Sequence, residues 1–273
     1  MFTPRKEETP PRTIGLLTDF GLSDPYVGQM KAVINGKAPA CTIIDISHDV
    51  APFNVAQAGF FLAASHVHFP KDAVILAVVD PGVGTDRRIV GLQLDERLLI
   101  APDNGLLSLA LSSSWTNQVR AYDLTKAVEA PNKVSHTFHG RDVFAPLAAW
   151  LALGGNPAGL GGEIEPASLV RCDWSTPEVK ETSARCHVLH IDRFGNCVLN
   201  LEAASVPNVS RLHLQSPSRF DLAYVTTYAE MPDGMPGLLE GSQGFLEIAM
   251  NQHSAAKELG LSMGDQLTLT WEE

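Results

Sequence analysis

The sequence contains no run of 18 or more apolar residues, and we therefore expect no transmembrane helix. Its opening stretch, MFTPRKEETPPRT, lacks the apolar core of a signal peptide, and residues 1–12 are expected to form a frayed extension. The 4 cysteines show no C-x-x-C spacing, which argues against structural zinc and gives no reason to expect disulfides. These absences predict a cytoplasmic protein that does not act at a membrane.

Positive charge is scarce in this chain. The 20 Lys and Arg residues are outnumbered by 31 Asp and Glu residues, which gives a net charge of −11. Such a balance argues against nucleic acid or an anionic membrane as a partner, because both attract basic surfaces. With 273 residues and 45% hydrophobic content, the chain is long enough to bury a sizeable core in one large domain or two ordinary ones.

Apolar runs in the first part of the chain alternate between strand-like and helix-like patterns. Asn54 is a candidate N-cap, and Pro25 suits the first turn of a helix. The expected strands are 14–17, 41–46, 73–79, 89–94, 98–101 and 119–122, and the expected helices are 25–37, 55–68, a short one ending at 111, and 143–153. Alternation of this kind predicts an α/β layered domain over residues 13–172.

The pattern changes after about residue 170. Pro, Glu, Lys, Thr and Ser crowd residues 174–183, which predicts a linker and a domain boundary within 172–184. The expected strands beyond it are short: 187–191, 197–201, 211–214, 223–228, 244–249 and 266–271. Regularly spaced short strands with Gly and Pro turns predict a smaller, barrel-like all-β domain over residues 185–273.

The stretch AVILAVVDPGVGTDRR, residues 73–88, is the first candidate for a functional site. Its apolar run is typical of a fully buried strand, and ligands bind at the carboxyl ends of such strands in open α/β sheets. Asp80 stands at the end of this strand, and Arg87 follows across a Pro-Gly turn. The alternative is a tight connection whose Asp80 and Arg87 form a surface ion pair. The loop lacks the spacing of a dinucleotide fingerprint and the Lys of a P-loop.

A second polar cluster is VSHTFHGRD, residues 134–142. His136, His139 and Asp142 could form part of a zinc or iron site, since imidazole and carboxylate suit both metals. No H-E-x-x-H pattern accompanies them, and we expect no metal. Arg141 and Asp142 are expected to form a local ion pair at a helix start.

Seven phrases, in order, resemble the S-adenosyl-L-methionine (SAM) hydroxide adenosyltransferases, also called SAM hydrolases, which are relatives of the fluorinases and chlorinases. The phrases are TDFGLSDPYVGQMK, DISHDVAPF, VVDPGVGTDRR, APDNG, TFHGRD, IDRFGN and NQHSAA. Any one of them is weak evidence, but seven collinear ones make coincidence improbable. The resemblance implies an α/β amino domain, a β-barrel-like carboxyl domain, and a homotrimer with active sites at subunit interfaces.

The resemblance also implies a reaction, in which water or hydroxide attacks the ribose C5′ of SAM and releases adenosine and L-methionine without a cofactor. An Asp, Arg and His set prepares the water in the family, and the matching positions are Asp80, Arg87 and His139. Arg87 would stabilise hydroxide, while Asp80 and His139 would orient the water and share its proton.

The matching substrate-binding positions have different expected tasks. Asp19 would accept hydrogen bonds from the ribose hydroxyls, Asp192 would bind the ammonium group, and Asn196 would read adenine. The aromatic residues that would flank the nucleoside are Phe53 and Phe194, and the enclosing segment contributes Asn251 and Ala255, chiefly through backbone groups. Without the resemblance, each of these has an ordinary structural interpretation, such as a core Phe or a turn Asn.

The alternative functions are halogenation, non-catalytic sensing and metal-dependent hydrolysis. The fluorinases carry tyrosine where this chain has Asp80 and an extra loop in the region of residues 92–104, and a carboxylate would repel a halide, so halogenation is not favoured. A non-catalytic SAM or adenosine sensor would need Asp19 and Asn196 but not the Asp80, Arg87 and His139 set. A metal-dependent hydrolase would use the His136, His139 and Asp142 cluster.

Overall fold

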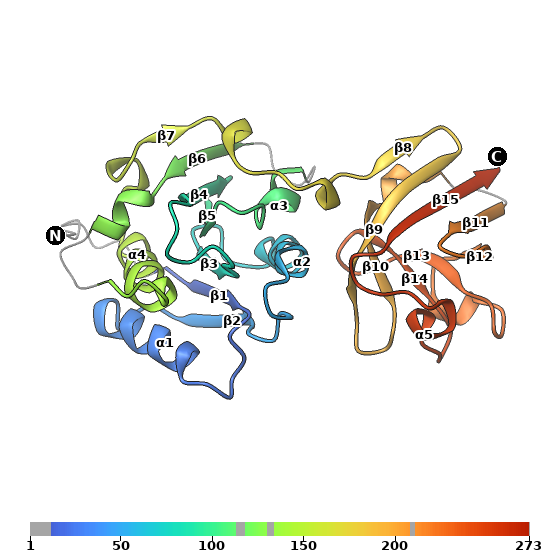
Figure 1. Ribbon diagram of the computed structural model, residues 1–273, viewed down its shortest axis with the longest axis horizontal. Helices are drawn as coiled ribbons and strands as arrows, with labels where there is room; N and C mark the ends of the chain where they lie inside the picture. The colour runs from blue at the N-terminus through green and yellow to red at the C-terminus, as the bar shows by residue number, and fades with distance from the viewer. Residues whose placement is uncertain (1–11, 113–117, 130–133, 208–210, 273) are drawn as a thin grey trace. The chain divides into compact units, whose positions relative to one another are not determined.

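The computed structural model describes residues 12–112, 118–129, 134–207 and 211–272 (Figure 1). The chain divides into two compact units, 1–171 and 172–273. The expected frayed extension lies outside the described residues except for Arg12. Within the described ranges, no helix is both long and apolar enough to cross a bilayer.

The first unit contains a mixed sheet of seven strands in the order β2-β1-β3-β5-β4-β6-β7. β1 lies parallel to β2 and β3, and β3 lies parallel to β5, whereas β4 pairs antiparallel with β5 and β6. The strands are β1 (Ile14–Thr18), β2 (Ile43–Ser47), β3 (Val74–Val78), β4 (Ile89–Leu94), β5 (Arg97–Pro102), β6 (Val119–Asp123) and β7 (Glu163–Ile164). The α-helices are α1 (Tyr26–Lys37), α2 (Val55–His66), α3 (Ser108–Ser112) and α4 (Ala145–Ala152).

Helices cover both faces of this sheet, as Figure 1 shows. α1 and α4 pack on one face through Met30, Ile34 and Leu147, and α2 packs on the other through Ala58 and Leu62. The connection from β1 to β2 therefore runs over one face, and the connection from β2 to β3 runs over the other. The chain changes its winding direction between β1 and β3, which is where open α/β sheets bind ligands.

The sequence pattern explains the central elements directly. Every residue of β3 is at most 2% exposed, as expected for a continuous apolar run. The side chain of Asn54 accepts a hydrogen bond from the Gln57 backbone N–H and so caps α2 as predicted. The expected hairpin forms between β4 and β5, with Asp95 at φ 53° in its turn.

His66, in the last turn of α2, is buried without a hydrogen-bond partner on either ring nitrogen among the described residues. Burial and the nearby Arg97 lower the pKa of His66 to about 4. The folded state therefore favours the neutral ring, and its stability should fall as the pH drops from the unfolded pKa of about 6.5 toward 4.

We expect protonation of His66 in the unfolded state to lower the free energy of unfolding by about 2 kcal/mol between pH 7 and pH 5. His66→Leu should remove that part of the pH dependence, because leucine leaves no ring to protonate. Urea unfolding of both proteins across this pH range measures the difference, with His68→Leu, at an exposed position, as the control. Parallel pH profiles for wild type and His66→Leu would contradict the assignment.

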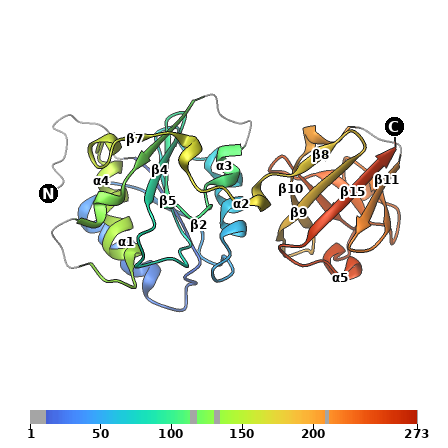
Figure 2. The same ribbon diagram turned by 45° about the horizontal axis from the view of Figure 1, so that its top comes forward.

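The second unit is a closed barrel of seven strands with a β8 extension, shown from another side in Figure 2. The sheet runs β10-β14-β13-β12-β11-β15-β9, β9 pairs back to β10, and β8 lies outside against β9. The elements are β8 (Glu178–Lys180), β9 (Ser183–Ile191), β10 (Cys197–Glu202), β11 (Arg211–Ser216), β12 (Phe220–Tyr224), β13 (Gly237–Glu240), β14 (Phe245–Ala249), α5 (Ala255–Leu259) and β15 (Gln266–Glu272). This architecture confirms the predicted fold class of an α/β domain followed by a barrel.

Several expected boundaries were wrong. The stretch expected as a linker, 174–183, carries β8 and the first residue of β9, because charged residues occur on an exposed edge strand as readily as in a loop. The expected strand 223–228 ends at Tyr224, and β13 was missed because Gly237–Glu240 is short and flanked by Pro and Gly. The helix expected from residue 143 begins at Gly140 with a π-helical turn that reaches Phe144.

Candidate active site

A cavity of about 490 Å³ lies where β1 and β3 end. The two strands are parallel with Thr18 opposite Val78, so the residues that follow them, Asp19 and Asp80, reach the same edge of the sheet. The volume falls within the range of small-molecule sites. The lining residues are Asp19, Phe20, Tyr26, Pro52, Phe53, Val78, Asp80, Val83, Thr137, Phe138, His139 and Gly140.

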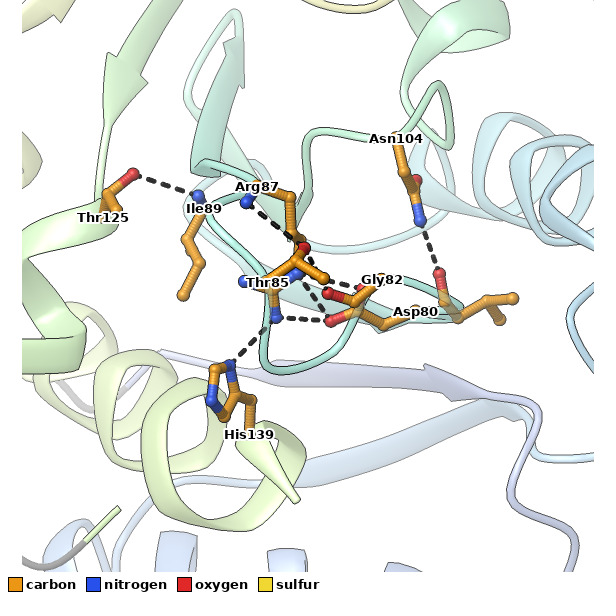
Figure 3. A network of polar contacts seen from close by, with 9 residues as sticks. Asp80, Gly82, Thr85, Arg87, Ile89, Asn104, Thr125 and His139 are labelled. Carbon is orange, nitrogen blue, oxygen red and sulfur yellow. Dashed lines mark hydrogen bonds and ion pairs between the residues drawn. The ribbon is translucent and has the colours of Figure 1, made fainter. Parts of the chain in front are cut away.

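Asp80 and Arg87 form a buried ion pair at this edge (Figure 3). The Arg87 Nε–H donates to both carboxylate oxygens of Asp80, at 2.9 and 2.8 Å, and Nη2 donates to Oδ2 as well. The side chain of Arg87 is only 10% exposed and that of Asp80 only 4%, so the alternative of a surface pair is wrong. The guanidinium carbon also lies 5.7 Å from the centre of the Phe144 ring, a distance typical of a cation–π contact.

His139 completes this group from a distant segment of the chain. Its Nδ1 lies 3.1 Å from Arg87 Nη2 (Figure 3). Because a guanidinium only donates, Nδ1 accepts and the ring proton of neutral His139 sits on Nε2. Burial and the neighbouring Arg87 lower the pKa of His139, which favours the neutral ring. Asp80, Arg87 and His139 thus meet in one place, as predicted.

The loop that carries Asp80 and Arg87 is fixed by local contacts. Gly84 has φ 81°, and a Cβ there would lie 2.5 Å from the His136 carbonyl oxygen, so this position requires glycine. The Thr85 hydroxyl donates to the Gly82 carbonyl at 2.7 Å. Asn104, from the phrase APDNG, donates to the Val79 carbonyl at 2.8 Å and holds the end of β3 beside Asp80. These contacts leave the ion pair little freedom.

Asp19 and Phe53 line the same cavity as Asp80 and His139. The Phe53 backbone N–H donates to Asp19 Oδ2 at 2.9 Å, and burial raises the pKa of Asp19. Phe53 itself is 71% exposed at φ 66°, a conformation that side chains rarely adopt. It is therefore a surface aromatic rather than a core residue. The Thr18 hydroxyl and His48 Nδ1 lie 2.8 Å apart and join the end of β1 to the residue that follows β2.

Three cavity-lining aromatic residues were not predicted as site residues. Phe20, Tyr26 and Phe138 contact one another edge to face, with ring centres 5.0 to 6.0 Å apart. They form an apolar wall beside the polar group. All three stand inside the phrases TDFGLSDPYVGQMK and TFHGRD, but an isolated aromatic residue gives no signal that separates a cavity wall from a core.

Two of the three side chains in the alternative metal cluster, His139 and Asp142, are engaged in other contacts. His139 Nδ1 accepts from Arg87, and Asp142 accepts from Arg141 at 2.6 Å and from the Ser135 N–H at 2.9 Å. Arg141 and Asp142 thus form the expected local ion pair. Across the described ranges, no three His, Cys, Asp or Glu residues are grouped so that they could hold a metal ion.

The remaining predicted residues gather in the second unit, mostly around a separate cavity of about 490 Å³. The Asp192 carboxylate accepts from the backbone N–H of Phe194 and of Asn196 and from Asn196 Nδ2, each at 2.9 Å. Phe194 is 78% exposed. Asn251 lines this cavity, whereas the Ala255 side chain is buried in the barrel core. The backbone N–H of Ala256 donates to the Gly195 carbonyl at 2.9 Å, which ties α5 to the loop that contains Asp192.

Comparisons with known proteins identify the relatives of the whole chain. Models of the SAM hydroxide adenosyltransferase N-terminal and C-terminal domains match residues 14–161 and 186–268. A protein of Thermus thermophilus named (R)-S-adenosyl-L-methionine hydrolase is 40% identical over 93% of this chain and 97% of its own length. A fluorinase of an Actinoplanes species is 25% identical over 94% and 97%.

A solved structure shows the same fold. An uncharacterized conserved protein from Thermotoga maritima superimposes with a TM-score of 0.83 at 32% identity, over 94% of this chain and 99% of its own. The two family models together span most of the chain. The chain therefore belongs to the SAM hydroxide adenosyltransferase family.

Proposed function

We propose that this protein hydrolyses SAM to adenosine and L-methionine through attack of water or hydroxide on the ribose C5′. The observation that carries the proposal is the buried contact of Asp80, Arg87 and His139 at the wall of a cavity that also contains Asp19. The 40% identical Thermus thermophilus relative bears the name of such a hydrolase, which supports the same conclusion.

In the proposed reaction, the substrate is already activated, because its sulfonium leaves as a neutral thioether. The site has only to prepare and align the nucleophile. Arg87 stabilises hydroxide character, and Asp80 and His139 orient the water and share its proton. Since His139 Nδ1 accepts from Arg87, that nitrogen takes a proton only if Arg87 turns toward the water. The bond from oxygen to C5′ forms as the C5′–sulfur bond breaks.

We assign the binding residues as the family resemblance implies. Asp19 accepts hydrogen bonds from the ribose hydroxyls through the oxygen that Phe53 leaves free. Asp192 receives the ammonium group, and Asn196 reads adenine. Phe53 and Phe194 flank the nucleoside, which accounts for two large aromatic side chains left exposed. Asn251 and Ala255 enclose the substrate chiefly through backbone groups.

We further propose a cytoplasmic homotrimer with active sites at subunit interfaces. In support, each cavity carries only part of the expected substrate-binding set. Sedimentation velocity should give three times the chain mass of 29.4 kDa. A monomer at assay concentrations would contradict the assembly but leave the chemistry open to test.

The decisive experiment is turnover of SAM by chelator-treated protein in water enriched in ¹⁸O. We expect adenosine and L-methionine in equal amounts, with the label in the adenosine 5′ hydroxyl and none in methionine, because water attacks C5′. Loss of activity on chelation that zinc or iron restores would favour the metal-dependent hydrolase. SAM that binds but persists would favour the sensor.

A further inference from the structure

The cavity of the second unit contains a polar pair to which the proposed reaction gives no role. Tyr228, which lines the cavity, donates its hydroxyl hydrogen to Oε1 of Glu247. Glu247 belongs to β14 and is 5% exposed, whereas Tyr228 is 44% exposed. A buried carboxylate behind an accessible phenol is costly to maintain, because burial penalises its charge. We therefore expect a ligand that offsets the cost of burying this charge.

The charge around this cavity has one sign. The described lining residues are Asp192, Phe194, Asn196, Tyr228, Met250, Asn251, Gln252 and His253, and they include no Lys or Arg. Glu247 adds a second carboxylate behind Tyr228. Burial raises the pKa of Glu247, and the nearby Asp192 raises it further. A cation bound between the two acids would reduce this repulsion.

The hydrogen-bonding capacity that remains is that of an acceptor. Asp192 already accepts three donors from its own loop, two of them on Oδ1, so Oδ2 keeps room for one more. The Tyr228 oxygen gives its hydrogen to Glu247 and keeps lone pairs that face no protein donor in the described part of the chain. An ammonium group, with three donors and a positive charge, matches these acceptors, whereas a sulfonium has no hydrogen to donate.

We propose that Tyr228, held by Glu247, receives the substrate's cationic amine together with Asp192, and that this contact restricts the protein to adenosylsulfonium compounds that carry a primary amine. The inference rests on the proposed function and names its substrate class. Tyr228 is a binding residue in this arrangement, and Glu247 is a positioning residue that acts through it.

The test compares Tyr228→Phe and Glu247→Gln with the intact full-length chain. In a His139→Ala background, which separates binding from turnover, calorimetry measures the Kd for SAM and for its analogue with hydrogen in place of the amine. We expect Tyr228→Phe to raise the Kd for SAM about tenfold and that for the deaminated analogue less than twofold. Glu247→Gln should act in the same direction. Tyr224→Phe, which removes a phenol hydroxyl outside the cavity, is the matched control.

Equal effects of Tyr228→Phe on both ligands, or none on either, would overturn the proposal. Glu247→Gln could fail through misfolding, but Tyr228→Phe changes one partly exposed hydroxyl and keeps the test decisive. Failure of the proposed function would be a separate result, in which wild-type protein leaves SAM intact. The Kd comparison would still show whether the amine is recognised.

Discussion

Replacement of His139 by alanine should lower kcat for SAM hydrolysis at least about 100-fold. The His139 ring is buried beside Arg87, and its Nδ1 accepts a hydrogen bond from the Arg87 guanidinium. Burial and Arg87 also lower the pKa of His139. A bulk water molecule cannot replace the ring, because nothing would hold it in that position. Affinity should change little, because the nucleoside contacts proposed for Asp19 and Phe53 remain. Steady-state turnover gives kcat, and calorimetry with adenosine, which undergoes no reaction, gives the affinity.

His136→Ala is the matched control for this experiment. His136 stands three positions earlier and is exposed, and it would be essential only in the metal-dependent alternative. We expect that variant to keep wild-type turnover. If His139→Ala also kept wild-type turnover, its assignment as a catalytic residue would be wrong, and equal losses in both variants would point to the metal cluster instead.

Asp80→Asn should reduce kcat about 1,000-fold and leave the Kd for adenosine within about threefold of wild type. Asparagine has nearly the same shape but cannot hold the Arg87 guanidinium as a counter-ion, and its amide cannot accept the proton of the water. Both side chains of the pair are buried, so the loss should also destabilise the first unit by about 3 kcal/mol. Turnover assays and urea unfolding measure the two effects.

Asp86→Asn provides the comparison within the same loop. Asp86 is exposed, and its replacement by asparagine removes one negative charge from the same segment without changing the ion pair. Its turnover and stability should match those of the wild type. An Asp80→Asn protein that folds normally and turns SAM over at the wild-type rate would refute the role given to Asp80.

Much of the fold could be predicted from local patterns. The buried run of β3, the Asn54 cap of α2 and the hairpin between β4 and β5 each depend on neighbouring residues, whose propensities and burial preferences the sequence displays. Very short strands were harder to predict. β8 (Glu178–Lys180) and β13 (Gly237–Glu240) pair with the strands that follow them, β9 and β14, but their own few residues resemble loop sequence.

The candidate site divides in the same way. The phrases around Asp80, Arg87 and His139 could be recognised in order, but their contacts come from the register of parallel strands and from a helix start 52 residues away in sequence. The aromatic wall of Phe20, Tyr26 and Phe138 had no distinct sequence signal, because an apolar ring gives the same sequence pattern in a core as at a cavity. The Tyr228 and Glu247 pair had none either.

The sequence by itself determined the fold class, the family resemblance and the candidate residues of both cavities, because these follow from composition, periodicity and short collinear phrases. Only the tertiary structure decided that Asp80 and Arg87 are buried together against His139, that Phe53 and Phe194 are exposed, and that a buried Glu247 stands behind Tyr228. The reason is physical: burial and hydrogen bonding between distant segments depend on how strands align and helices pack, and neither is a property of any one segment.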